Sequence, residues 1–82
     1  MLLIEYLCDK YILFRNSKGN DIYWKESALG YTDNIDEAGV FTGKDTFRYN
    51  VKVLQYHEVK SGKHRQYTHY AMTVKDAIQL LK

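Results

Sequence analysis

Strand-forming residues in the first third of the chain occur in two runs, 11–14 and 22–24. A polar segment, 16–20, separates them, and this pattern is typical of a β-hairpin. A loop of three residues at 17–19 would place Gly19 at a left-handed position, which glycine adopts without a steric cost. The sequence therefore predicts a hairpin over residues 10–26.

The loop length fixes the register of this hairpin. The expected pairs are Asn16 with Asn20, Arg15 with Asp21, Phe14 with Ile22, Ile12 with Trp24 and Lys10 with Glu26. Apolar pairs then occupy one face and a charge pair the other, which is how hairpin registers are normally specified. In this register Trp24 is a core residue.

Two short helical turns are expected in the middle of the chain. Asn34 can cap a turn with Glu37 reaching back, and Gly39 can end it in the left-handed conformation. Residues 40–41 are then expected to enter the core. Thr42, with an aspartate three residues later, predicts the start of a weak helix over 43–49.

A second hairpin is expected from residues 51–58 and 65–70, joined at Ser61-Gly62. A two-residue turn pairs Glu58 with Arg65, and a three-residue loop pairs Glu58 with His64. The first register is preferred because it gives a salt bridge and an aromatic pair, although Ser-Gly leaves both open.

The last predicted element is a helix that starts after Thr73. Threonine is a good N-cap, and an aspartate three residues later complements the helix dipole. Its apolar stripe comprises Val74, Ala77, Ile78 and Leu81. Together the elements predict a single α+β domain over 1–82, in which two hairpins form a small antiparallel sheet packed by the C-terminal helix, with one or two short helical turns between.

Composition agrees with one small globular domain and adds an aromatic bias. The chain has 82 residues, 45% of them hydrophobic, with 8 Tyr, 3 Phe and 1 Trp. Tyr and Trp suit both half-exposed sheet faces and binding surfaces. The single cysteine, Cys8, cannot form an internal disulfide, so we expect a cytoplasmic protein and a buried structural thiol. Residues 1–7 fit a first strand or buried arm, and neither a signal peptide nor a membrane span.

Charge is divided unevenly along the chain. Residues 1–43 hold four basic and seven acidic side chains, whereas 44–82 hold eight basic and three acidic ones. Four of the basic residues, Lys52, Lys60, Lys63 and Arg65, alternate with tyrosines at 56, 67 and 70. This segment, 52–70, could bind nucleic acid. The alternative is an exposed hairpin with solubilising charges, and the small net charge of +2 favours it.

The residue pattern contains no signature of catalysis. Phosphate loops, dinucleotide fingerprints and zinc spacings are absent from the sequence. Two of the three histidines, His57 and His64, would be diagonal neighbours on one face of the second hairpin, but they lack a nearby third ligand in sequence, so solvated histidines are expected. We predict no catalytic, cofactor or metal site, and a protein that is not an enzyme.

Three short motifs resemble a module of small bacteriophage and prophage proteins. They are Asp21-Ile22-Tyr23-Trp24-Lys25-Glu26, Gly30-Tyr31-Thr32-Asp33-Asn34-Ile35 and Glu37-Ala38-Gly39-Val40-Phe41. The resemblance covers roughly residues 10–50 and carries no agreed activity. It implies a phage or prophage protein that binds a host factor, with a host defence nuclease such as a CRISPR effector as one candidate.

The first functional hypothesis is therefore a non-enzymatic protein that binds a host protein. Its expected contact residues surround the second hairpin turn: Lys60, Lys63, His64, Arg65 and Tyr67. The second hypothesis is nucleic-acid binding by 52–70, and a third is capture of a nucleotide-like signal in a pocket of tyrosines and histidines. No cofactor and no membrane partner are expected, and the oligomeric state stays open.

Overall fold

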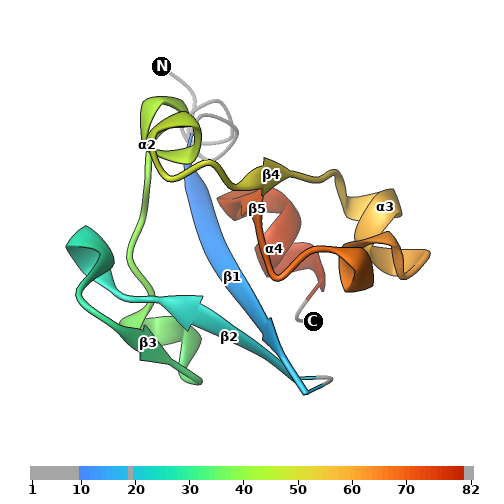
Figure 1. Cartoon of the computed structure of the whole chain (residues 1–82), viewed down its shortest axis with the longest axis horizontal. Coiled ribbons are helices and arrows are strands. Elements are labelled where there is room, and N and C mark those ends of the chain that lie inside the picture. Colours follow the sequence, from blue (N-terminus) through green and yellow to red (C-terminus); the bar gives the residue numbers. More distant parts are fainter. Residues whose placement is uncertain (1–9, 19, 81–82) are drawn as a thin grey trace.

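The computed structural model describes residues 10–18 and 20–80, which fold around one five-stranded sheet (Figure 1). In chain order the elements are β1 (Tyr11–Ser17), β2 (Asn20–Trp24), η1 (Glu26–Ala28), β3 (Tyr31–Thr32), η2 (Ile35–Glu37), α2 (Gly43–Arg48), β4 (Lys52–Val53), α3 (Tyr56–Lys60), η3 (Lys63–Gln66), β5 (His69–Thr73) and α4 (Val74–Leu80), where η marks a 3₁₀ helix. The predicted α+β class and the C-terminal helix are confirmed.

The sheet is mixed, with the strand order β3-β2-β1-β5-β4. The central strand β1 pairs antiparallel with both β2 and β5, while β4 runs parallel to β5 at the edge. Three consecutive residues of β1, Ile12, Leu13 and Phe14, are buried. Successive side chains of a strand point to opposite faces, so an uninterrupted apolar run identifies a strand that is covered on both sides.

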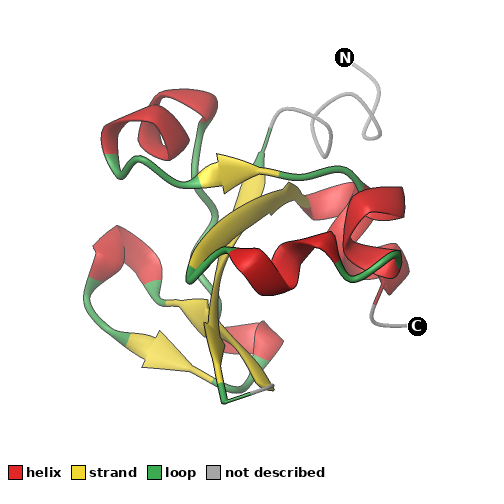
Figure 2. Ribbon diagram, turned by 45° about the vertical axis from the view of Figure 1, so that its right-hand side comes forward, coloured by secondary structure: helices red, strands yellow, loops and turns green. Residues whose placement is uncertain are grey.

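Each face of the sheet carries its own core. On one face Phe14 stacks on Tyr70 with ring centroids 4.9 Å apart, and Tyr23 meets Phe14 edge-on at 5.2 Å. Helices α3 and α4 cover this face, which we call the helix face, with Val59 and Ala77. The other face, here the aromatic face, has a smaller core of Leu13, Phe41 and Ala71. Figure 2 shows α3 and α4 gathered together, apart from α2.

The first hairpin forms as predicted, but its register is shifted by one residue. Phe14 lies opposite Tyr23 and Ser17 opposite Asn20, which leaves two residues between the strands. Lys18 there has φ +51°, the sign that a two-residue hairpin loop favours. Gly19, expected to be left-handed, lies outside the described residues. The shift places Tyr23 against Phe14 on the helix face and sends Trp24 to the aromatic face, where it is half-buried. The expected pairing of Ile12 with Trp24 is therefore wrong.

The middle segment follows two of its capping signals. The Asn34 side chain accepts a hydrogen bond from the Asp36 N–H, and Thr42 and Asp45 form a complete capping box at the start of α2. Three expectations are wrong. Glu37 does not reach back to Asn34, because it accepts from the Thr32 hydroxyl at 2.8 Å while the Asn34 N–H donates to that hydroxyl at 3.1 Å. Gly39 is not left-handed, and Val40 is 53% exposed, although Phe41 is buried as expected. Gly39 is required because a Cβ there would lie 2.6 Å from the Glu26 backbone.

The second hairpin is absent from the described chain, and the prediction of residues 51–58 and 65–70 as paired strands is wrong. Residues 56–60 form α3 and 63–66 form η3, so the chain crosses over between the parallel strands β4 and β5. Parallel neighbours require such a crossover. The helix brings Val59 into the core of the helix face. Gly62, with φ +88°, marks a turn as expected, but it joins two helices.

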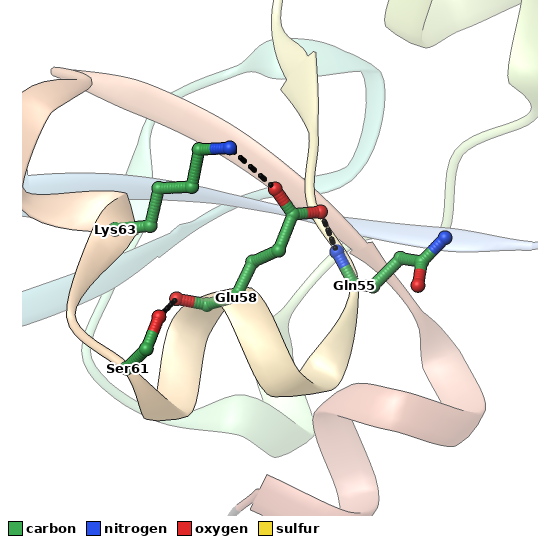
Figure 3. A network of polar contacts seen from close by, with 4 residues as sticks. All are labelled: Gln55, Glu58, Ser61 and Lys63. Atoms are coloured by element: carbon green, nitrogen blue, oxygen red, sulfur yellow. Dashed lines mark hydrogen bonds and ion pairs between the residues drawn. The ribbon is translucent and has the colours of Figure 1, made fainter.

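One carboxylate replaces the predicted cross-strand pair of that hairpin. Figure 3 shows Glu58 between two donors: the Gln55 N–H at 3.1 Å and the Lys63 Nζ at 3.2 Å. The Ser61 hydroxyl donates to the Glu58 carbonyl at 2.8 Å. The Gln55 N–H, followed by Lys63, holds the pKa of the Glu58 carboxyl below its usual value. Glu58 therefore fixes both ends of the short helix and pairs with neither Arg65 nor His64.

The C-terminal helix begins as predicted, because the Thr73 hydroxyl accepts from the Asp76 N–H at 3.1 Å. Its apolar stripe differs from the expectation: Ala77 is buried and Leu80 packs on the core, but Ile78 is 43% exposed. Leu81, Cys8 and the N-terminal arm of residues 1–7 lie outside the described residues. No helix in the described ranges has both the length and the apolar character to cross a membrane.

Candidate binding surface

The aromatic face presents a cluster of rings around Trp24. Its indole lies 5.3 Å from the Tyr49 ring, 5.5 Å from His69 and 6.0 Å from Tyr31, and it also meets Phe41 edge-on. We call these five residues the aromatic cluster. They come from β2, β3, β5 and the segments on either side of α2. Most of the ring pairs are near perpendicular, the geometry that aromatic quadrupoles favour.

Two arginines lie against this cluster. The Arg15 guanidinium is 5.1 Å from the centroid of Tyr31, and that of Arg48 is 5.7 Å from the centroid of Tyr49. Arg15 reaches Tyr31 because the observed register places it opposite Ile22 and not opposite Asp21. Cation–π contacts hold both guanidinium groups over rings. Arg, Tyr and Trp are also the residues that most often dominate binding energy at interfaces.

A groove of about 440 Å³ opens between η1 and α2, beside the aromatic cluster. Its lining comes from Glu26 and Ser27 of η1, from Val40 and Phe41, and from Asp45, Arg48 and Tyr49 of α2 and its end. We call it the η1–α2 groove. Phe41 and Tyr49 belong to both features, so the groove and the cluster form one continuous surface.

One exposed apolar side chain lies in the η1–α2 groove, and two others lie outside its lining. Val40 in its wall is 53% exposed. Phe47 on α2 is 87% exposed and Leu29, directly after η1, is 81% exposed, but neither is among the lining residues. Single exposed apolar residues are common, so Val40 counts here because it lies in a groove with polar and aromatic neighbours.

The backbone of η1 is also unusual at the groove. Ser27 and Ala28 both have positive φ values, +57° and +58°. A left-handed conformation costs a residue with a Cβ about 1–2 kcal/mol. Such conformations concentrate at functional sites, where the surrounding structure maintains them. The backbone conformation of η1 is therefore one that the intrinsic preferences of serine and alanine disfavour.

A second hollow of about 390 Å³ lies on the other side of the cluster, at the entrances of the parallel strands β4 and β5. Residues 50–52 and 66–69 line it, and we call it the β4–β5 pocket. His69 is shared with the aromatic cluster. Burial, followed by the charge of Arg15, lowers the pKa of His69, so its imidazole is neutral at pH 7. Its Nε2 atom is buried and has no hydrogen-bond partner among the described residues.

A polar cluster lies on the helix face. The Tyr70 hydroxyl donates to Asp21 Oδ2 at 3.0 Å, and His64 Nε2 is 3.9 Å from the same oxygen. Burial, followed by the Asp21 charge, raises the pKa of Tyr70 strongly, and the same two causes raise that of Tyr23. A phenol held in its protonated form next to a carboxylate serves as a hydrogen-bond donor. This arrangement is structural, since the Tyr70 side chain is fully buried.

The residues predicted to bind a partner are placed in two different ways. Lys60, Lys63 and Arg65 are exposed, and of these Lys63 is paired with Glu58. His64 turns inward onto Tyr70, and Tyr67 packs against the core of the helix face. Because the second hairpin does not form, these five side chains do not surround a projecting turn.

The basic-aromatic stacking surface expected over 52–70 is likewise not assembled. Tyr70 has no exposed surface for a base to stack on, and the Lys60 ammonium lies 5.9 Å from the centroid of Tyr56. His57 is exposed on α3, whereas His64 is half-buried in η3, so they are not diagonal neighbours on a sheet. Within residues 10–18 and 20–80, no group of three potential metal ligands is found.

Sequence reasoning missed the arginines and most rings of the aromatic face. Arg15, Tyr31 and the consecutive pair Arg48 and Tyr49 come from three separate segments, so no single local motif contains all of them. The high tyrosine content was the one available signal, and composition does not say where the rings meet. No family model, no curated protein and no solved structure matches this chain.

Proposed function

We propose that this chain is a non-enzymatic protein-binding module that contacts its partner through the η1–α2 groove and the aromatic cluster. The observation that carries the proposal is the η1–α2 groove itself, where Val40, 53% exposed, lies with Arg48 and Tyr49. An exposed apolar side chain gains its full transfer free energy only when a partner covers it, about 1.5–3 kcal/mol. Neighbouring Arg and Tyr side chains add contacts typical of interface hot spots.

Charge and backbone support a protein ligand at this groove. Its lining contains two carboxylates, Glu26 and Asp45, and one guanidinium, Arg48. A mixture of both charges matches a polypeptide surface better than the uniformly negative backbone of nucleic acid. The left-handed residues 27–28 keep one wall in a fixed shape, which lowers the entropic cost of binding.

The position of the groove in the sequence suggests the kind of partner. All of its lining residues lie between 26 and 49, inside the stretch that resembles small phage and prophage proteins. That resemblance supports a host protein as the partner, with a defence nuclease as one candidate. Nucleic-acid binding by 52–70 is the alternative proposal. Lys52, Lys60 and Arg65 are exposed cations that would serve it, and Lys63 is exposed but paired with Glu58.

The test uses a photo-crosslinking amino acid placed at position 40 in the full chain, inside the cell that makes the protein. The matched control carries the same group at position 78, because Ile78 is an exposed apolar residue on α4, which covers the helix face. We expect a defined crosslinked protein from position 40 that position 78 does not give.

The partner identified in this way is then purified, and its affinity is measured by titration calorimetry. Val40→Ser is expected to weaken binding at least tenfold and Ile78→Ser to leave it unchanged, with both variants melting close to the parent. Equal affinities of Val40→Ser and the parent would show that the groove is not the contact surface. Loss of binding only when Lys60 and Arg65 are replaced by Gln would return the contact to the segment expected from sequence.

A further inference from the structure

The β4–β5 pocket differs from the η1–α2 groove in both construction and charge. It lies at the N-terminal ends of the parallel strands β4 and β5. Lys52, the first residue of β4, is in register with Tyr70, the second residue of β5. Its lining contains the ammonium of Lys52 and no carboxylate. The pocket therefore favours an anion, whereas the groove presents both charges.

The other lining groups are suited to a planar, hydrogen-bonding ligand. Asn50 and Gln66 provide side-chain amides, which carry donors and acceptors together. Tyr67 and His69 also line it and are both half-buried; Tyr67 packs against the core of the helix face, and the His69 ring lies in the aromatic cluster. Asn50, two residues after the end of α2, has a φ of +55°. At about 390 Å³ the hollow is at the small end of the range of ligand sites.

A second cation lies near the pocket but on the other face of the sheet. Arg15 is the cross-strand partner of His69, and its guanidinium is held over the Tyr31 ring on the aromatic face. Lys52 is in register with Tyr70, whose side chain packs on the helix face, so the Lys52 side chain leaves β4 on that face. Lys52 is therefore the one cation among the residues that line the pocket. A positive charge next to aromatic rings is the combination that proteins use to bind phosphate and base together.

We propose that the β4–β5 pocket binds a nucleotide unit, with the base against His69, its edge hydrogen-bonded by Asn50 or Gln66, and the phosphate held by Lys52. This site is separate from the protein contact proposed above. The same chemistry is offered by a free mononucleotide and by one residue of a single-stranded nucleic acid, and the experiment distinguishes these two sources.

The experiment titrates the ¹⁵N-labelled full chain with AMP, UMP, inorganic phosphate and twelve-residue oligoadenylate and oligouridylate. We expect amide shifts confined to residues 50–52 and 66–69, together with quenching of the Trp24 indole, which contacts His69. Saturation by AMP or UMP alone identifies a free nucleotide as ligand. Saturation by an oligonucleotide at least tenfold below the mononucleotide concentration identifies a single strand.

Two variants separate specific binding from general attraction to positive charge. Lys52→Gln should weaken binding about tenfold, the loss expected for one charged hydrogen bond to phosphate. Lys75→Gln removes the same charge from an exposed position on α4 and should change nothing. Equal losses in the two variants, equal shifts with AMP and inorganic phosphate, or no shifts with any nucleotide at millimolar concentration would each overturn the proposal.

Discussion

Replacing Tyr70 by Phe should reveal how much the buried pair with Asp21 stabilises the sheet. The substitution keeps the ring that stacks on Phe14 at 4.9 Å and removes only the hydroxyl that donates to Asp21 at 3.0 Å. A hydrogen bond to a charged group is worth about 1.5–3 kcal/mol. The Asp21 side chain is 30% exposed, so water can replace part of the interaction. We therefore expect a loss of about 1.5 kcal/mol in the free energy of unfolding.

A double-mutant cycle in urea, with Asp21→Ala as the second change, isolates this pair. If the pair acts as the structure indicates, the two losses are not additive, and the coupling free energy is about 1–2 kcal/mol. A coupling free energy near zero would refute the reasoning, because the hydroxyl would then be stabilised by something other than Asp21.

The pH dependence gives a second, independent readout of the same pair. Burial and the Asp21 charge raise the pKa of Tyr70 in the folded state, while the unfolded chain keeps a pKa near 10. Below pH 10 the phenol is protonated in both states, so its contribution is fully present. Above pH 10 the unfolded chain releases the proton first, and stability falls. The advantage of the parent over Tyr70→Phe should shrink by about 1.4 kcal/mol between neutral pH and pH 11.

Two further substitutions test the packing. Gly39→Ala should lower the free energy of unfolding by about 1–3 kcal/mol, because the added Cβ would lie 2.6 Å from the Glu26 backbone. Gly43→Ala is the matched control, since its Cβ would lie 3.8 Å from the nearest atom, and it should leave the urea midpoint unchanged or raise it. Trp24→Ala should cost about 3 kcal/mol, since the indole is half-buried among four rings, and Trp24→Phe should recover most of that loss in the same assay. Similar midpoints for the two glycine variants, or for the parent and Trp24→Ala, would contradict these packing arguments.

Local signals in the sequence predicted the parts of the fold that short-range interactions decide. The caps at Thr42 and Thr73 formed as expected, because each threonine bonds the N–H group three residues later. The first hairpin also formed. Its register was wrong because a ring from β5 helps to decide it: Tyr70 stacks on Phe14, and Tyr23 completes that group. A contact over such a separation cannot be read from the alternation of residues within the hairpin.

The crossover from β4 to β5 was missed for a related reason. Residues 51–70 alternate well enough to suggest two strands, and Ser61-Gly62 suggests a turn between them. The competing helical signal is weak: Gln55 is a poor N-cap residue, although Glu58 does accept its N–H. Burial of Val59 against the sheet then favours the helix. Tertiary contacts therefore overrode a plausible strand pattern, as they commonly do in short segments.

The same shift in register explains why the candidate surface could not be foreseen. Had Trp24 paired with Ile12 as expected, the indole would lie on the helix face and be covered by helices. The observed register moves it to the opposite face and releases Arg15 from Asp21 to lie over Tyr31. Arg15, Trp24 and His69 then meet beside a pocket and a groove that lie on either side of one aromatic cluster. A difference of one residue in a single loop thus decides whether these rings serve as interior packing or form the surface proposed for binding.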